Sequence, residues 1–150
     1  MHREWGIEQI VRDARVAMIY EGTNEIQAID LLVRKIMPDG GHSLNQLLDD
    51  LKTDTQAETT EATQLRKLTQ QILLASEQNP SLGHQVADDF LRALALVLLQ
   101  WAWQRIDAQL TQDTPNVTDR WHAPSKAFRQ WVLPEFAMRC HIIQTQCQTA

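Results

Sequence analysis

The sequence contains few of the residues that interrupt helices. Only five glycines and five prolines occur among its 150 residues. Ala, Leu, Gln, Glu and Arg, which favour helices, are abundant instead, so the composition favours an all-α fold. A chain of this length forms one ordinary domain, or the end of one together with a small second one, and it can bury a sizeable core.

The chain also lacks a long apolar segment and a cluster of positive charge. No run of about 18 apolar residues occurs, and the first residues, MHREWGIEQ, contain no apolar core of a signal peptide. We therefore expect a cytoplasmic protein without a membrane span. The formal net charge is −5, and Lys and Arg do not gather anywhere, which argues against nucleic acid as a partner.

Metal-binding and disulfide-forming residues are sparse. The two cysteines, Cys140 and Cys147, lie on one predicted helix, about 10 Å apart along its axis, which is too far for a disulfide. We expect both to be free thiols in a reducing compartment. The five histidines are scattered, and no two of them are four positions apart on a helix, so we predict no metal site.

Apolar residues recur every three or four positions in several segments, a spacing typical of helices with one buried face. The predicted helices span residues 7–20, 24–36, 44–51, 61–78, 83–112 and 124–148. Pro38 to Gly41 and Asn79-Pro80 end two of them, and Pro134 is expected to kink or divide the last. The three long helices after residue 60 have short connections, which predicts an antiparallel helical bundle.

The same spacing predicts which side chains are buried. In the second helix these are Ile26, Ile29, Leu32 or Val33, and Ile36. In the helix over residues 61–78 they are Leu65, Leu68 and Ile72. In the last helix they are Phe128, Trp131, Val132, Phe136 and Ile143. The helix over residues 83–112 is apolar over a wide arc, so we expect neighbours on several of its sides. Trp101, Trp103, Trp121 and Trp131 are interpreted as core or capping residues rather than as the lining of a cleft.

The apolar face of the first helix runs directly into Glu21, and Gly22 follows. A carboxylate held among apolar side chains has a raised pKa and becomes a better proton acceptor, while a glycine beside it lets a ligand approach the backbone. These features suit abstraction of a proton next to a carbonyl group. They equally suit a structural acid paired with Arg12 or Arg15.

The residues after this glycine suggest the start of a new helix. Thr23 or Asn24 is expected to cap the helix over residues 24–36. Gln27 follows Asn24 by three positions, as in a capping box.

Residues 12–36, RDARVAMIYEGTNEIQAIDLLVRKI, resemble the C-terminal signature of the acyl-CoA dehydrogenases, flavoproteins that oxidise acyl-CoA thioesters to enoyl-CoA. The resemblance implies FAD as cofactor, an acyl-CoA as substrate and an electron-transfer acceptor as partner. It implies that Glu21 removes the α-proton of the substrate while the β-hydride passes to the flavin. It also implies that Tyr20 and Gly22 contact the substrate and that Thr23, Asn24, Glu25 and Gln27 contact the FAD.

The remaining chain resembles a narrower group. The segments HQVADDFLRALALVLLQWAWQRI and APSKAFRQWVLPEFAMRCHII are similar to an extra C-terminal helical domain of larger bacterial acyl-CoA dehydrogenases, including those that act on methylthio-substituted propionyl-CoA. The resemblance divides the chain into residues 1–40, the end of the catalytic C-terminal helical domain, and residues 41–150, the extra helical bundle. The expected fold is thus an all-α antiparallel bundle of the acyl-CoA dehydrogenase C-terminal type.

Since the resemblance covers only the end of such an enzyme, we expect an expressed fragment or a truncated reading frame that binds no flavin tightly and has no dehydrogenase activity. We expect the helices over residues 7–20 and 24–36 to pack onto the bundle over residues 61–148 or onto a second copy, and we predict a homodimer. The alternative is a non-catalytic helical module for oligomerisation or protein interaction.

Overall fold

The described part of the chain consists of helices and short joins. A computed structural model describes residues 8–18, 23–110 and 115–149. Its elements are α1 (Glu8–Ala14), η1 (Arg15–Met18), α2 (Asn24–Ile29), η2 (Asp30–Ile36), α3 (His42–Thr55), α4 (Thr60–Ser76), α5 (Leu82–Leu110), α6 (Pro115–Ala127), η3 (Phe128–Val132) and α7 (Glu135–Thr149). η1 is a 3-10 helix, whereas η2 and η3 are π-helical. No strand occurs in these ranges, so the all-α class is confirmed.

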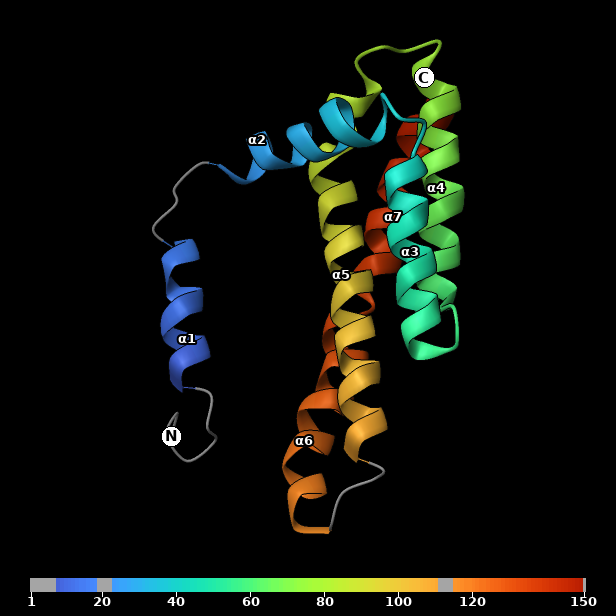
Figure 1. The fold of residues 1–150 in the computed structure, drawn as a ribbon. Coiled ribbons are helices and arrows are strands. Elements are labelled where there is room, and N and C mark those ends of the chain that lie inside the picture. The colour runs from blue at the N-terminus through green and yellow to red at the C-terminus, as the bar shows by residue number, and fades with distance from the viewer. Residues whose placement is uncertain (1–7, 19–22, 111–114, 150) are drawn as a thin grey trace.

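Three long helices, α4, α5 and α7, form the body of the fold. Each of them packs against the other two (Figure 1). The chain reverses direction from α4 to α5 and again from α5 to α7, as an antiparallel bundle requires. Fully buried side chains at their contacts include Leu65, Leu68, Ile72, Phe90 and Ile143. The three residues from α4 are the face that the apolar spacing predicts.

Two predicted helices have wrong boundaries. α3 starts at His42 and ends at Thr55, and so extends beyond residues 44–51 at both ends. α6 starts at Pro115 rather than at residue 124. Proline suits the first turn of a helix because its missing N–H has no partner there in any case. The last two residues of the predicted helix over 83–112 lie outside the described residues.

Two side chains predicted to be buried in the last helix are exposed. Trp131 is 76% exposed and Val132 is 41% exposed. Both lie in η3, where the N–H of Leu133 donates to the carbonyl oxygen of Phe128, five residues earlier, at 2.9 Å. A π-helical turn contains more residues than an α-helical turn, so the α-helical spacing places these side chains on the wrong side. Pro134 follows and separates η3 from α7, as predicted.

The first predicted helix does not pack onto the bundle. None of the residues of α1 is buried, Ile10 is 67% exposed, and α1 stands apart from α3 to α7 in Figure 1. For residues 8–14, packing onto the bundle, the first of the two predicted alternatives, does not occur, and packing onto a second copy stays a prediction. Packing onto the bundle does occur for α2 and η2, which both contact α5. In the part of the chain that the structure describes, no helix has the length and apolarity needed to cross a membrane.

Candidate functional site

The residues assigned by resemblance lie around the start of α2. Tyr20, Glu21 and Gly22 fall outside the described residues. Thr23 directly precedes α2 and is half-buried. The side chains of Asn24, Glu25 and Gln27 are all exposed. These four polar side chains therefore lie together on the first turn of one helix.

The expected capping box is not formed. Thr23 has φ −97° and ψ −11°, which is helical rather than extended, and its side chain makes no capping hydrogen bond. An N-cap residue normally needs extended backbone to place its side-chain oxygen near the free N–H groups. Asn24 is already helical, and the N–H of Gln27 donates to the carbonyl oxygen of Thr23 at 2.9 Å. The polar side chains of this turn thus face outward instead of closing the helix end.

Residues 23–36 form an arm that crosses one end of α5 (Figure 1). α2 continues without a break into η2. Ala28, Leu32 and Ile36 are 0%, 1% and 4% exposed, so the arm is anchored through every fourth residue. Ile26, predicted to be buried, is 64% exposed because it lies before the first anchoring residue, on the free end of the arm.

A glycine on α5 lets the arm approach closely. A Cβ atom at Gly83 would lie 2.7 Å from Sδ of Met37 and 3.1 Å from Cγ2 of Val33. Distances this short are below ordinary van der Waals contact, so the missing side chain is what permits the contact. Sequence reasoning missed this anchor, and the only signal for it was a glycine in the first turn of α5.

The join after the arm is fixed by backbone hydrogen bonds. Asp39 accepts from the N–H of Gly41 at 2.9 Å and from the N–H of Ser43 at 3.0 Å. Hydrogen bonds from Ser43, together with those from Gly41, lower the pKa of the Asp39 carboxyl. Gly40 and Gly41 have φ of 64° and 78°, which glycine adopts without strain. The helix therefore ends at residues 38–41 as predicted, in a hydrogen-bonded turn that sets the direction of the arm relative to α3.

Charges on the arm pair locally. Asp30 lies 2.8 Å from Nζ of Lys35 and 3.4 Å from the guanidinium of Arg34. The hydrogen bond from Lys35 is the main cause of the lowered pKa of Asp30. On α1, Arg12 donates to Glu8 at 2.6 Å and to Gln9 at 2.8 Å. Arg12 therefore has a carboxylate partner on its own helix, whereas Glu21, with which Arg12 or Arg15 was an alternative pair, lies outside the described residues.

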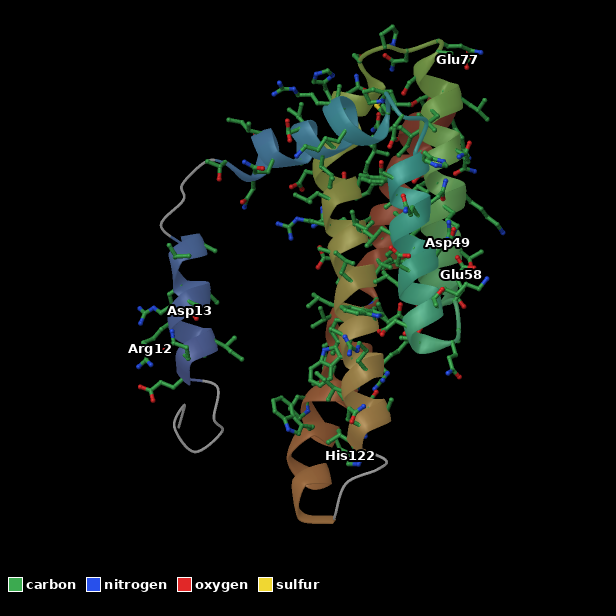
Figure 2. All side chains as sticks on the ribbon, viewed as in Figure 1. Arg12, Asp13, Asp49, Glu58, Glu77 and His122 are labelled. Carbon is green, nitrogen blue, oxygen red and sulfur yellow. The ribbon has the colours of Figure 1, made fainter. Side chains whose placement is uncertain are left out.

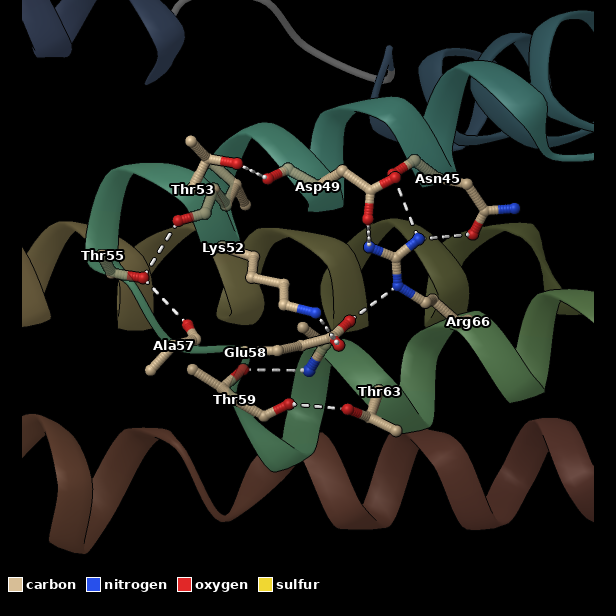
Figure 3. A network of polar contacts seen from close by, with 12 residues as sticks. Asn45, Asp49, Lys52, Thr53, Thr55, Ala57, Glu58, Thr59, Thr63 and Arg66 are labelled. Carbon is tan, nitrogen blue, oxygen red and sulfur yellow. Dashed lines mark hydrogen bonds and ion pairs between the residues drawn. The ribbon is translucent and has the colours of Figure 1, made fainter.

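Other polar clusters join helices within the bundle. Arg66 of α4 donates to Glu58 at 2.7 Å, to Asp49 of α3 at 2.6 Å, and to the side chain of Asn45 at 3.0 Å (Figure 3). These contacts hold α3 against α4. In Figure 2, Asp49 lies on α3 and Glu58 lies in the join between α3 and α4, far from the labelled Asp13 on α1. The cluster is therefore distinct from α1.

A second cluster holds α6 and η3 to α5. Buried Ser125 donates to Asp107 at 2.9 Å, and Arg129 donates to both of them. Beside it, the ring centroid of Trp103 lies 6.5 Å from that of Trp121 and 6.1 Å from that of Phe128. In the described part of the chain, the polar partners of Ser125 and Arg129 are other members of the cluster, as expected for a structural contact. Among the described residues, His, Cys, Asp and Glu side chains do not form a group able to hold a metal ion.

The geometry defines an all-α protein with a helical bundle and a projecting arm whose free end carries exposed polar groups. A family model described as "Acyl-CoA dehydrogenase, C-terminal domain" matches residues 1–37. This match includes α1 and the whole arm. Residues 1–37 are therefore similar to the C-terminal domain of the acyl-CoA dehydrogenases.

Two curated relatives that the chain resembles are also named as acyl-CoA dehydrogenases. The chain is 50% identical over 46 residues to a "3-methylmercaptopropionyl-CoA dehydrogenase" of Ruegeria pomeroyi, covering 31% of this chain and 8% of the relative. It is 26% identical over 170 residues to the "Broad-specificity linear acyl-CoA dehydrogenase FadE5" of Mycobacterium tuberculosis, covering 95% of this chain and 28% of the relative. No solved structure matches. The chain thus spans less than a third of either relative.

Proposed function

We propose that this chain is the part of an FAD-dependent acyl-CoA dehydrogenase that supplies its catalytic carboxylate. In this proposal, Glu21 accepts the α-proton of an acyl-CoA thioester. Tyr20 and Gly22 contact the substrate beside the thioester. The match of residues 1–37 to the family's C-terminal domain is the observation that carries the proposal.

The proton transfer needs one group that is unprotonated and close to the α-carbon. Loss of the α-proton and loss of a hydride from the β-carbon together leave a double bond between the two carbons. Glu21 is proposed to take the proton, and Gly22 leaves room beside it for the thioester. Bound FAD would supply the hydride acceptor.

The described residues fit FAD only as one edge of its site. Thr23, Asn24, Glu25 and Gln27 offer a hydroxyl, amides and a carboxylate on one helical turn, which suits hydrogen bonds to a flavin nucleotide. Three of these four side chains are exposed, and the arm meets the bundle only from Ala28 onward. A single exposed turn can contact a cofactor but cannot enclose it. We therefore propose that the isolated chain binds no flavin tightly and is inactive.

The second candidate is a helical module for assembly without catalysis. It is favoured by the apolar side chains that α1, η1 and the arm expose, Ile10, Val16 and Ile26, which are 67%, 50% and 64% exposed. Exposed apolar side chains on adjacent elements are typical of surfaces that other polypeptides cover. In the first proposal, the same side chains pack against the rest of the enzyme.

A chimera separates the two candidates. Residues 1–37 of this chain replace the matching segment of the Ruegeria relative, and oxidation of 3-methylmercaptopropionyl-CoA is measured in the flavin-loaded chimera. Glu21→Gln should lower turnover on the order of 10²–10⁴-fold, the usual contribution of a positioned general base. Flavin content, read from absorbance, should be unchanged.

The control is Asp13→Asn, which removes one carboxylate from an exposed position of α1. It should leave turnover within about twofold, as is usual for an exposed surface change. Equal activity of Glu21→Gln and Asp13→Asn would exclude the catalytic role. Flavin that co-purifies stoichiometrically with the isolated chain would contradict the proposal that this chain alone binds no flavin tightly.

A further inference from the structure

The helical turn that is proposed to contact FAD is followed directly by the residue that joins α2 to the core. In this turn, Asn24, Glu25 and Gln27 are exposed, and Thr23 makes no capping hydrogen bond with its side chain. Ala28 comes next, is 0% exposed and belongs to the hydrophobic core. The place of the turn relative to the bundle therefore depends on the contact that Ala28 makes.

This contact is with α5. α2 packs against α5, and Ala28 is the residue of α2 that becomes buried. In Figure 1 the arm crosses the end of α5. The axes of two packed helices lie about 8–10 Å apart, depending on the side chains at the contact. Since the side chain of alanine is a single methyl group, Ala28 lets α2 approach α5 at the short end of this range.

A second small residue holds the other end of the arm. Gly83, in the first turn of α5, faces Val33 and Met37, which a Cβ atom at Gly83 would meet at 3.1 Å and 2.7 Å. Ala28 and Val33 are separated by roughly 8 Å along the arm. A helix that is held at two separate points keeps its direction as well as its distance from its support. The two close contacts therefore determine where the free end of the arm lies.

A displacement at Ala28 passes directly to the proposed site. The helix is continuous from Asn24 to Ala28, and the N–H of Gln27 donates to the carbonyl oxygen of Thr23, so the turn moves as one piece. Glu21 precedes Thr23 by two residues, which covalent geometry keeps within about 7 Å of each other. Misplacing a reacting group by about 1 Å can lower a rate about 10²-fold.

We propose that Ala28 is a positioning residue, whose small side chain sets the distance from α5 at which residues 23–27 meet the flavin and Glu21 meets the substrate. Ala28 is buried in the core and acts through the helix that carries these residues. This inference rests on the proposed function. It also gives the bundle, which lies outside the matched residues 1–37, a part in the reaction, because α5 is the support against which the site is placed.

Distance measurements in the full chain test the placement. One nitroxide label is attached at Glu25→Cys on α2, and the second at Gln70→Cys on α4 or at Gln109→Cys on α5, all of which are exposed positions. Cys147 is replaced by serine, and buried Cys140 should remain unlabelled. Electron–electron double resonance then gives two mean distances from the arm to the bundle.

Larger side chains at position 28 should move the arm. Ala28→Leu should change at least one of the two distances by roughly 2 Å, which is the spread of helix spacings with side-chain size. Ala28→Val should change it less, and Ala28→Ser, which is nearly equal in volume, should leave both distances as in the wild type. Ala95→Leu is the matched control, since it makes the same change at an exposed position of α5 and should move nothing. Circular dichroism should show equal helicity for all five chains.

Flavin reduction tests the role in the reaction. Residues 1–150 replace the matching C-terminal segment of the mycobacterial relative, and reduction of the bound flavin by a linear acyl-CoA is followed in a single turnover. Ala28→Leu should lower the rate at saturating substrate about 10²-fold, with flavin content and the half-saturating concentration unchanged. A purely structural role would instead lower flavin content or the melting temperature. Ala28→Ser and Ala95→Leu should keep the rate within about twofold of the wild type.

The outcomes separate this inference from the proposed function. Unchanged distances in Ala28→Leu would overturn the positioning role. So would an unchanged rate for Ala28→Leu in a chimera that Glu21→Gln inactivates. A chimera whose rate is unaffected by Glu21→Gln would contradict the proposed function itself, and the positioning role would fall with it.

Discussion

Truncation of Leu32 to alanine tests how the arm is held. Leu32 is 1% exposed and lies at the centre of the buried face of the arm, between Ala28 and Ile36. Removing a fully buried leucine side chain costs about 2–5 kcal/mol, because apolar burial is lost and a cavity remains. With a urea dependence of about 1–3 kcal/mol/M for a small protein, the urea midpoint should fall by roughly 1–3 M. The assay is equilibrium urea unfolding followed by far-ultraviolet circular dichroism.

Ile26→Ala is the matched control on the same arm. Apolar spacing in the sequence groups Ile26 with Leu32, whereas the structure leaves Ile26 64% exposed. Its truncation should change the free energy of unfolding by no more than about 0.5 kcal/mol. Equal losses for the two variants would refute the register of the arm described here. A small loss for Leu32→Ala would refute its anchoring on α5.

Two further predictions concern titrating groups. Burial raises the pKa of the Cys140 thiol to about 11 and also raises the pKa of Cys147. With a disulfide reagent at pH 8, half-buried Cys147 should therefore react first and buried Cys140 only after unfolding in urea; equal rates in the folded chain would contradict this. The lowered pKa of Asp39 means that its stabilising contribution is present above its ordinary value of 3.8 and is lost as pH falls through the folded pKa. Asp39→Ala should therefore lower the melting temperature at pH 6 but have little further effect well below pH 3.8, and a constant difference at all pH values would show that the turn does not depend on the carboxylate.

Sequence reasoning succeeded where helices are regular and surrounded by partners. Leu65, Leu68 and Ile72 follow simple α-helical spacing, and all three are fully buried. It failed at Trp131, because a π-helical turn changes the spacing and nothing in the local composition marks that turn. It also failed at Ile26, since the end of the arm projects past the helix that covers the rest of it.

For the candidate site, the sequence likewise identified residues but not the contacts between distant helices. The residues that carry the resemblance are contiguous, so a single sequence was enough to single them out. The close contact at the end of the arm was not predictable, because it joins Gly83 to Val33 and Met37 across the fold. Such a contact depends on how two helices cross, and local sequence does not determine that crossing.

The most direct test of the account is the rate of flavin reduction in the chimera that carries residues 1–37. The flavin-loaded chimera and its Glu21→Gln variant are mixed rapidly with 3-methylmercaptopropionyl-CoA, and the loss of oxidised flavin absorbance is followed in a single turnover. The account predicts a decrease on the order of 10²–10⁴-fold for Glu21→Gln, with the thioester still bound. An unchanged rate would show that Glu21 does not accept the proton, and the chain would then be a helical module without a catalytic residue.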